Sequence, residues 1–137
     1  MDKKLNDIIV LQTKNLQNLL EMLEKQHDNI VKEDAFKMEK IVDEIKECNI
    51  EIAKVEMLRK ELTKDKAISD IILQSNNDEL EENYRKIRKI VNEVILQKET
   101  NELLIKQGIG YTNKMLQVLS PSRRSAKTYG ATGKLRR

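Results

Sequence analysis

The stretch DAFKMEKIVDEIKECNIEIAKVEMLRKELT, residues 34–63, decides the fold class of this chain. Apolar residues recur in it every three or four positions, which is the spacing of one face of an α-helix. The pattern predicts a helix over residues 34–63, roughly 40 Å long, with Asp34 as its N-cap. Seven of the eight positions on this face are apolar, and the eight are Met38, Ile41, Ile45, Cys48, Ile52, Val55, Arg59 and Leu62.

Glycine and proline are confined to the end of the chain. Residues 1–107 contain neither, although average usage would place about a dozen there. A β-sandwich, a Rossmann or P-loop fold and a small disulfide framework need glycine turns or cysteine pairs, so the predicted fold class is all-α. Because aromatic residues make up only 3% of the chain, the core must be thin and aliphatic, which favours an elongated shape. The glycine and proline residues, which disfavour helices, are Gly108, Gly110, Pro121, Gly130 and Gly133.

Two further helices flank residues 34–63. A face that is apolar at six of eight positions predicts a helix over about 4–31, and Gln12 and Gln26 are its polar members. The apolar residues of this helix span about 140° of its circumference, which is enough for one helix contact. A third helix is predicted over about 77–119, after a connector at 64–78.

The predicted architecture is an elongated antiparallel helical hairpin or three-helix bundle with a long third helix. The bundle would occupy residues 1–119, and the third helix would end before Pro121, with a bend at Gly108 and Gly110. Residues 120–137 have almost nothing apolar to bury, so they are expected to form a flexible basic tail that is disordered alone.

The last part of the third helix has a wide apolar face. Between Leu103 and Leu119, apolar side chains cover about half of the helix circumference. One explanation is a second surface to cover, on another protomer or on a client protein. The other explanation is burial by the remaining two helices on two sides, and the sequence leaves both open.

The charge of the chain is divided between body and tail. Residues 120–137 carry six basic residues and no acid, which leaves −3 on residues 1–119 of a chain whose net charge is +3. Six cations could contact the phosphates of a nucleic acid, but no aromatic platform is interleaved with them. A tail that is solvated or docks on a protein is therefore favoured, and no nucleic-acid partner is expected.

The sequence offers little catalytic chemistry. His27 is the one histidine, Cys48 is the one cysteine, and no glycine-rich phosphate loop is present. Neither a His/Cys metal site nor a nucleophile with its base can be assembled in one chain, so no enzyme activity, cofactor or metal is expected. Two polar residues on the helix faces favour structural roles: Asn101 could set helix register, and Arg59 either does the same or extends past the end of a thin core.

Membrane insertion is also not expected. A bilayer span takes roughly 20 apolar residues, and no run in this chain approaches that length. The start of the chain lacks the apolar segment of a signal peptide, and a lone cysteine fits a reducing compartment. A cytoplasmic location is therefore predicted.

Four short motifs occur in order along the chain. A leucine repeat, LQNLLEML, occupies residues 16–23, and VEMLRKEL at 55–62 closes the second predicted helix. NELL at 101–104 precedes Tyr111 and the apolar MLQVL segment, and the tail contains TYGATG at 128–133. In this order the motifs resemble the FlgN family of flagellar export chaperones, over nearly the whole chain.

The resemblance implies a protein that guards hook-filament junction proteins, also called hook-associated proteins, before type III export. It implies cargo binding by the last helix and the tail, with docking on the flagellar export gate as a further role. The residues expected to contact the client are Asn101, Leu104, Ile105, Tyr111, Met115, Leu116 and Leu119, assisted in the tail by Arg123, Arg124, Tyr129 and Gly130. A self-associating structural coiled coil is the main alternative, and a nucleic-acid-binding helical module is less favoured.

Overall fold

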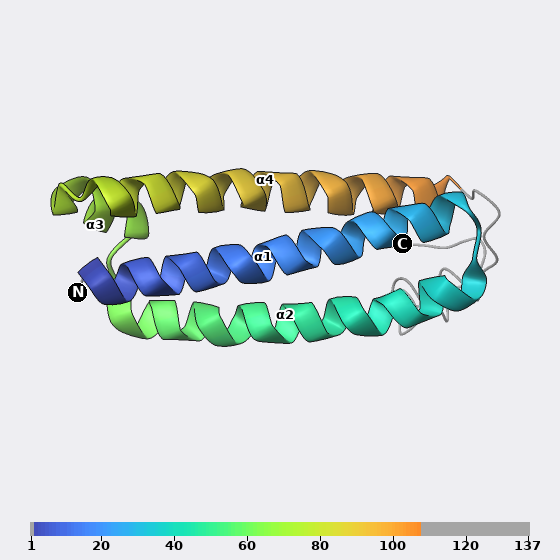
Figure 1. The fold of residues 1–137 in the computed structure, drawn as a ribbon, viewed down its shortest axis with the longest axis horizontal. Coiled ribbons are helices and arrows are strands. Elements are labelled where there is room, and N and C mark those ends of the chain that lie inside the picture. The colour runs from blue at the N-terminus through green and yellow to red at the C-terminus, as the bar shows by residue number, and fades with distance from the viewer. Residues whose placement is uncertain (1, 108–137) are drawn as a thin grey trace.

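The computed structural model describes residues 2–107, which form four helices. They are α1 (Asp2–Val31), α2 (Ala35–Thr63), α3 (Ile68–Ser75) and α4 (Asp78–Lys106). Figure 1 shows the three long helices side by side, with α1 between α2 and α4, and the short α3 at the end where the chain starts. The predicted all-α, elongated fold is confirmed. The predicted helix beyond Gln107, its bend and the basic tail lie outside the described residues.

The turn between α1 and α2 is a Schellman motif that is built without glycine. The amide of Asp34 donates to the carbonyl of Asn29, and the amide of Glu33 donates to the carbonyl of Ile30, both at 3.1 Å. Glu33 itself takes the left-handed conformation, with φ of 54°. Asp34 then caps α2, since its Oδ1 accepts from the amide of Lys37 at 3.1 Å. The predicted N-cap is thus confirmed.

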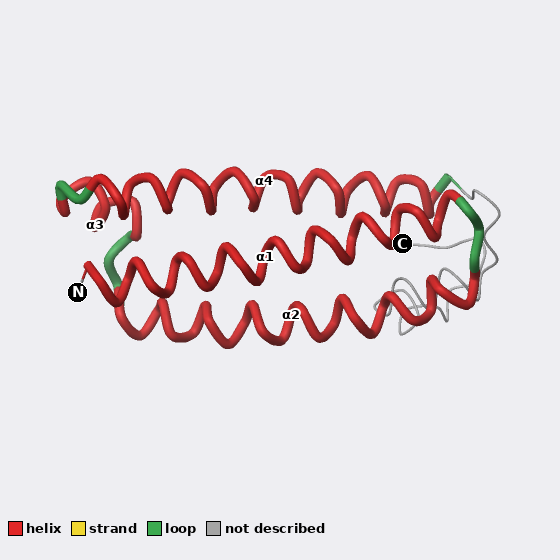
Figure 2. The backbone as a smooth tube through the Cα atoms, in the orientation of Figure 1, coloured by secondary structure: helices red, strands yellow, loops and turns green. Residues whose placement is uncertain are grey.

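The connector between α2 and α4 differs from the prediction. Residues 64–78 were expected to lack a helix of their own, but they contain α3, seen in Figure 2 between two short loops. The reason is that Ile68, Ile71 and Ile72 recur at the i, i+3, i+4 spacing of one helix face and pack against the start of α1 and α4. Asn76 takes the left-handed conformation, with φ of 51°, and Asn77 caps α4 by accepting from the amide of Leu80.

The central helix α1 packs along both α2 and α4, whereas the backbones of α2 and α4 approach each other far less. One helix contact was predicted for this face, and the structure has two. The reason is that α2 and α4 converge on the same stripe from either side. Around its middle, Leu19 and Leu23 pack with residues of α4 and also with Ile45 and Cys48 of α2.

The core runs along α1 as three aliphatic clusters. One pair in each cluster joins α1 and α4 at a spacing of 75 residues, and these pairs are Leu5 and Leu80, Leu19 and Val94, and Ile30 and Ile105. A hydrogen bond between Gln26 and Asn101 spans the same separation of 75 residues. A fixed spacing of this kind means that α1 and α4 run parallel and in register, as Figure 1 shows, while α2 runs opposite to both.

Candidate functional site

An open groove lies between α2 and α4, with α1 as its floor. We call it the α2–α4 groove, and its volume is about 410 Å³. It exists because the two outer helices pack on α1 and leave the space between themselves unfilled. Its lining residues are Gln12, Leu16, Ile52, Glu56, Arg59, Ile68, Tyr84, Ile87, Arg88, Val91 and Asn92.

The apolar part of the groove consists of half-buried aliphatic side chains. Leu16 comes from the floor, Ile52 from the α2 side, and Ile87 and Val91 from the α4 side. Leu16, Ile52 and Ile87 also pack against the core cluster of Leu19, Leu23, Ile90 and Val94. When a partner covers apolar surface that is partly hydrated in this way, the free energy of the system falls by about 25 cal/mol per Å².

A polar relay lies on the α2 side of the groove. The Nε2 of Gln12 donates to Oε1 of Glu56 at 2.8 Å, and Arg59 donates to both carboxylate oxygens of Glu56, through Nε at 2.9 Å and Nη2 at 2.7 Å. These bonds from Arg59 hold the pKa of the Glu56 carboxyl below its usual value. The guanidinium of Arg59 is therefore neutralised by a carboxylate of its own helix, at the edge of the core.

The α4 side carries a different kind of cation. The guanidinium carbon of Arg88 lies 5.8 Å from the ring centroid of Tyr84, a distance suited to a cation–π contact. Within the part of the chain that the structure describes, no carboxylate lies within ion-pair distance of Arg88. Arg85, one turn earlier, differs because it pairs with Glu82.

Three of the residues expected to bind a client fall within the described residues, and all lie near the α1–α2 turn. Asn101 is 1% exposed, and its Nδ2 donates to the carbonyl of Leu23 at 2.8 Å and to Oε1 of Gln26 at 2.9 Å. Ile105 is buried in the cluster around Ile30, and Leu104 packs half-buried against that cluster.

The burial of Asn101 and Ile105 does not fit direct contact with a client, because both side chains already contact α1. Their position instead supports the register role considered for Asn101, since its amide bonds join α1 and α4 at a single spacing. The remaining expected residues lie outside the described residues; they are Tyr111, Met115, Leu116, Leu119, Arg123, Arg124, Tyr129 and Gly130.

Two features of the described residues concern metal-binding and thiol chemistry. Within residues 2–107, no group of three or more His, Cys, Asp or Glu side chains could hold a metal ion. Burial, together with the charges of Glu44 and Glu47, raises the pKa of the Cys48 thiol, so the reactive thiolate is disfavoured. None of the described helices is long and apolar enough to cross a membrane.

Sequence reasoning missed the α2–α4 groove, although a signal for it was present. Gln12 and Arg59 are polar members of two otherwise apolar helix faces. In the structure both lie at the groove, joined through Glu56. This polar pair on α1 and α2 lies where the core opens, whereas the polar pair Gln26 and Asn101 on α1 and α4 is buried.

The fold and the groove define an elongated all-helical protein with an open groove between its outer helices. A family model described as FlgN protein matches residues 1–137, the whole chain. The chain belongs to the FlgN family, a family of flagellar export chaperones. No curated protein and no solved structure matches the chain significantly.

Proposed function

We propose that this protein is a cytoplasmic chaperone that binds hook-associated junction proteins before their type III export. The observation that carries the proposal is the family match over the whole chain. Client binding is assigned to the end of α4 and the residues that follow it, with the basic tail assisting and the export gate as a further partner. No catalytic step is part of this function.

The end of α4 supports this assignment through its exposed apolar residues. Leu103 is 55% exposed although it is large and apolar, and Leu104 is only half-buried. The sequence continues this apolar character to Leu119. A client segment that folds as it binds there would spend about 2 to 5 kcal/mol on ordering, which keeps the complex reversible. Reversibility suits a chaperone that must release its client for secretion.

Copurification with a hook-associated junction protein tests the proposal. Met115→Asp is expected to abolish the complex, because a charge would enter the apolar contact surface. Leu96→Asp is the matched control, since Leu96 is 66% exposed on α4, precedes the proposed contact surface and does not line the α2–α4 groove. Circular dichroism should show the same helicity for wild type and both variants. Full retention of the client by Met115→Asp would refute the assigned contact surface.

Self-association is a second candidate function, favoured by the outward face of α2. Phe36, Ile50 and Met57 are 86%, 55% and 64% exposed and recur at multiples of seven residues, opposite the face that packs on α1. A stripe with this spacing could pair with a second copy as a coiled coil. Sedimentation velocity at micromolar concentration decides this point: a stable dimer that Met57→Glu dissociates supports it, and a monomer excludes it.

A further inference from the structure

We propose that the start of α2 is a docking surface for residues 108–119 of the same chain, which follow α4 and fold back over Ile41 and Val42. Docked there, the segment closes the α2–α4 groove at the end next to the α1–α2 turn. Its apolar side chains are then kept from water within one chain. This inference goes beyond the proposed function, because it concerns the protein without any client.

The burial of Val42 identifies the docking surface. Val42, Asn49 and Glu56 are spaced by seven residues, so they share one face of α2, and Glu56 places that face at the groove. Asn49 is exposed and Glu56 is only half-buried, as expected beside an open groove. Val42 is nevertheless only 9% exposed, and Ile41 next to it is 3% exposed. The groove-side face of α2 is thus open at residues 49 and 56 but covered at residue 42.

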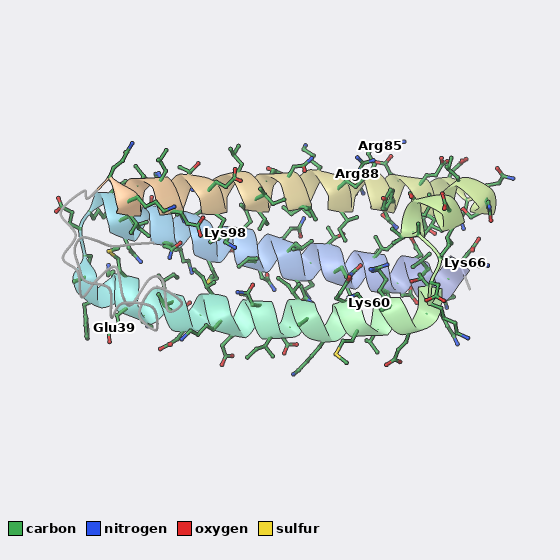
Figure 3. The ribbon with its side chains drawn as sticks, turned by 180° about the vertical axis from the view of Figure 1, so that it is seen from behind. Glu39, Lys60, Lys66, Arg85, Arg88 and Lys98 are labelled. Atoms are coloured by element: carbon green, nitrogen blue, oxygen red, sulfur yellow. The ribbon has the colours of Figure 1, made fainter. Side chains whose placement is uncertain are left out.

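The helices α1 to α4 do not supply this cover. The two buried side chains belong to none of the three aliphatic clusters formed by the described residues. Met38, one turn before Val42, packs with Ile105 of α4, which sets the level of α4 at this end. The groove-lining face of α4 continues there with Lys98 and Glu102, both exposed. Figure 3 shows Lys98 on α4, in the half of the bundle away from α3. Exposed charged side chains do not bury a valine, so another part of the chain covers it.

The cover belongs to the same chain and not to a second copy. The structure contains one chain, and the low exposure of Ile41 and Val42 is that of this chain alone. Residues 109–119 begin four positions after Ile105, and as a helix they would extend roughly 16 Å, whereas Val42 lies only about 6 Å beyond Met38 along α2. The segment can therefore reach the surface. The apolar side chains that it offers are Ile109, Tyr111, Met115, Leu116, Val118 and Leu119.

The charges around Val42 favour the same occupant. Residues 34–51 include six acidic and three basic residues. Glu39 and Asp43 flank Val42 and are exposed, and no cation in the described part of the chain lies within ion-pair distance of either. Residues 120–137, which directly follow the docking segment, carry six basic residues and no acid. Attraction between these opposite charges guides the end of the chain toward the start of α2.

A single tryptophan tests the docking, because the chain contains none. Tyr111→Trp in the full chain places a fluorescent reporter in the docking segment. In the folded protein, we expect its emission at shorter wavelength and its quenching by acrylamide to be weaker than in urea-unfolded protein. Adding Val42→Asp should increase the quenching about twofold, because a charge would enter the apolar contact. Leu58→Asp is the matched control, since Leu58 is 50% exposed on α2 and does not line the groove.

Charge reversal supplies a second variant that leaves the core packing intact. Replacing both Glu39 and Asp43 by lysine should increase the quenching of the reporter at low salt, and high salt should remove the difference. Glu99→Lys is its control, because Glu99 is exposed on α4. Circular dichroism shows whether each variant keeps its helices. If Val42→Asp loses them, the charge-reversed variant decides the test.

Three results would overturn the inference. The first is a reporter in the folded protein that is quenched as strongly as in urea. The second is a helical Val42→Asp, or a charge-reversed variant, that is quenched no more than its control. The third is protection of the reporter that disappears on dilution, because the contact would then be made by a second copy. All of these measurements use the protein without a junction protein, so their outcome is independent of the proposed function.

Discussion

Replacing Asn101 by leucine tests how α1 and α4 are held in register. The side chain is 1% exposed and donates to the carbonyl of Leu23 and to Oε1 of Gln26, while its own Oδ1 accepts from Gln97 at 3.0 Å. The carbonyl of Leu23 lies within α1, where the helix supplies its own donor. Gln97 is half-buried and can turn to water. Gln26, only 7% exposed, is the group left without a partner.

The expected loss of stability in Asn101→Leu follows from the unpaired side chain of Gln26 alone. A buried polar group left unsatisfied costs about 1 to 3 kcal/mol, so Asn101→Leu should lower the free energy of unfolding by about 2 kcal/mol. Gln26→Leu should cost about 1 kcal/mol, because Asn101 keeps its bonds to Leu23 and Gln97. Replacing both residues by leucine removes both members of the pair, which can be nearly neutral or stabilising.

Urea unfolding measures this double-mutant cycle. At a slope of about 2 kcal/mol per M, the loss of about 2 kcal/mol in Asn101→Leu shifts the midpoint by about 1 M. Gln17→Leu is the control for adding leucine to α1, since Gln17 is exposed. Additive costs, with the double variant about 3 kcal/mol below wild type, would show that the two amides are not coupled and would refute the reasoning.

Two further predictions concern the cap of α2 and the groove carboxylate. Asp34→Ala should lower the free energy of unfolding by about 1 kcal/mol, because the amide of Lys37 loses its acceptor, whereas Asp34→Asn should keep most of it; equal urea midpoints for Ala and Asn would contradict this. The pKa of Glu56 is lower in the folded protein than its ordinary value of 4.5, so its carboxylate stabilises the fold above that value. This contribution, below about 1 kcal/mol for a half-buried pair, is lost as the pH falls through the folded pKa. Glu56→Gln should therefore show a smaller fall of the urea midpoint below pH 4.5, and an unchanged acid profile would contradict the prediction.

Helix positions could be predicted from the sequence because long faces with regular apolar spacing leave little choice. The cap at Asp34 could be predicted because a short polar side chain stands directly before the apolar pattern, and α4 begins close to residue 77, where the third helix was predicted to start. The eight-residue α3 was not predicted, because a helix of two turns carries too few positions to show a period. Its stability comes from burial of Ile71 and Ile72 against distant residues.

The groove and the burial of Asn101 could not be predicted, because each depends on how the helices are placed around α1. A helical wheel gives the width of an apolar face but not the number of helices that share it. The stripe on α1 looked sufficient for one neighbour, but α2 and α4 both pack along it. Asn101 was expected to reach a client for a related reason: nothing in the local pattern shows that Gln26, 75 residues away, lies beside it.

The constant spacing between α1 and α4 also limits how this chain can change in length. Deleting seven residues from α1 would keep its apolar face but would set Leu5 and Ile30 opposite the wrong partners on α4. The same deletion made in α4 at the same height would restore every pair. Insertions between Thr63 and Ile68 shift the numbering of all of α4 by the same amount. The pairs between α1 and α4 therefore keep one common spacing, whatever the size of the insertion. The two parallel helices, together with α2 that packs along α1, can thus lengthen or shorten only together and by whole heptads, while the connector is free to vary.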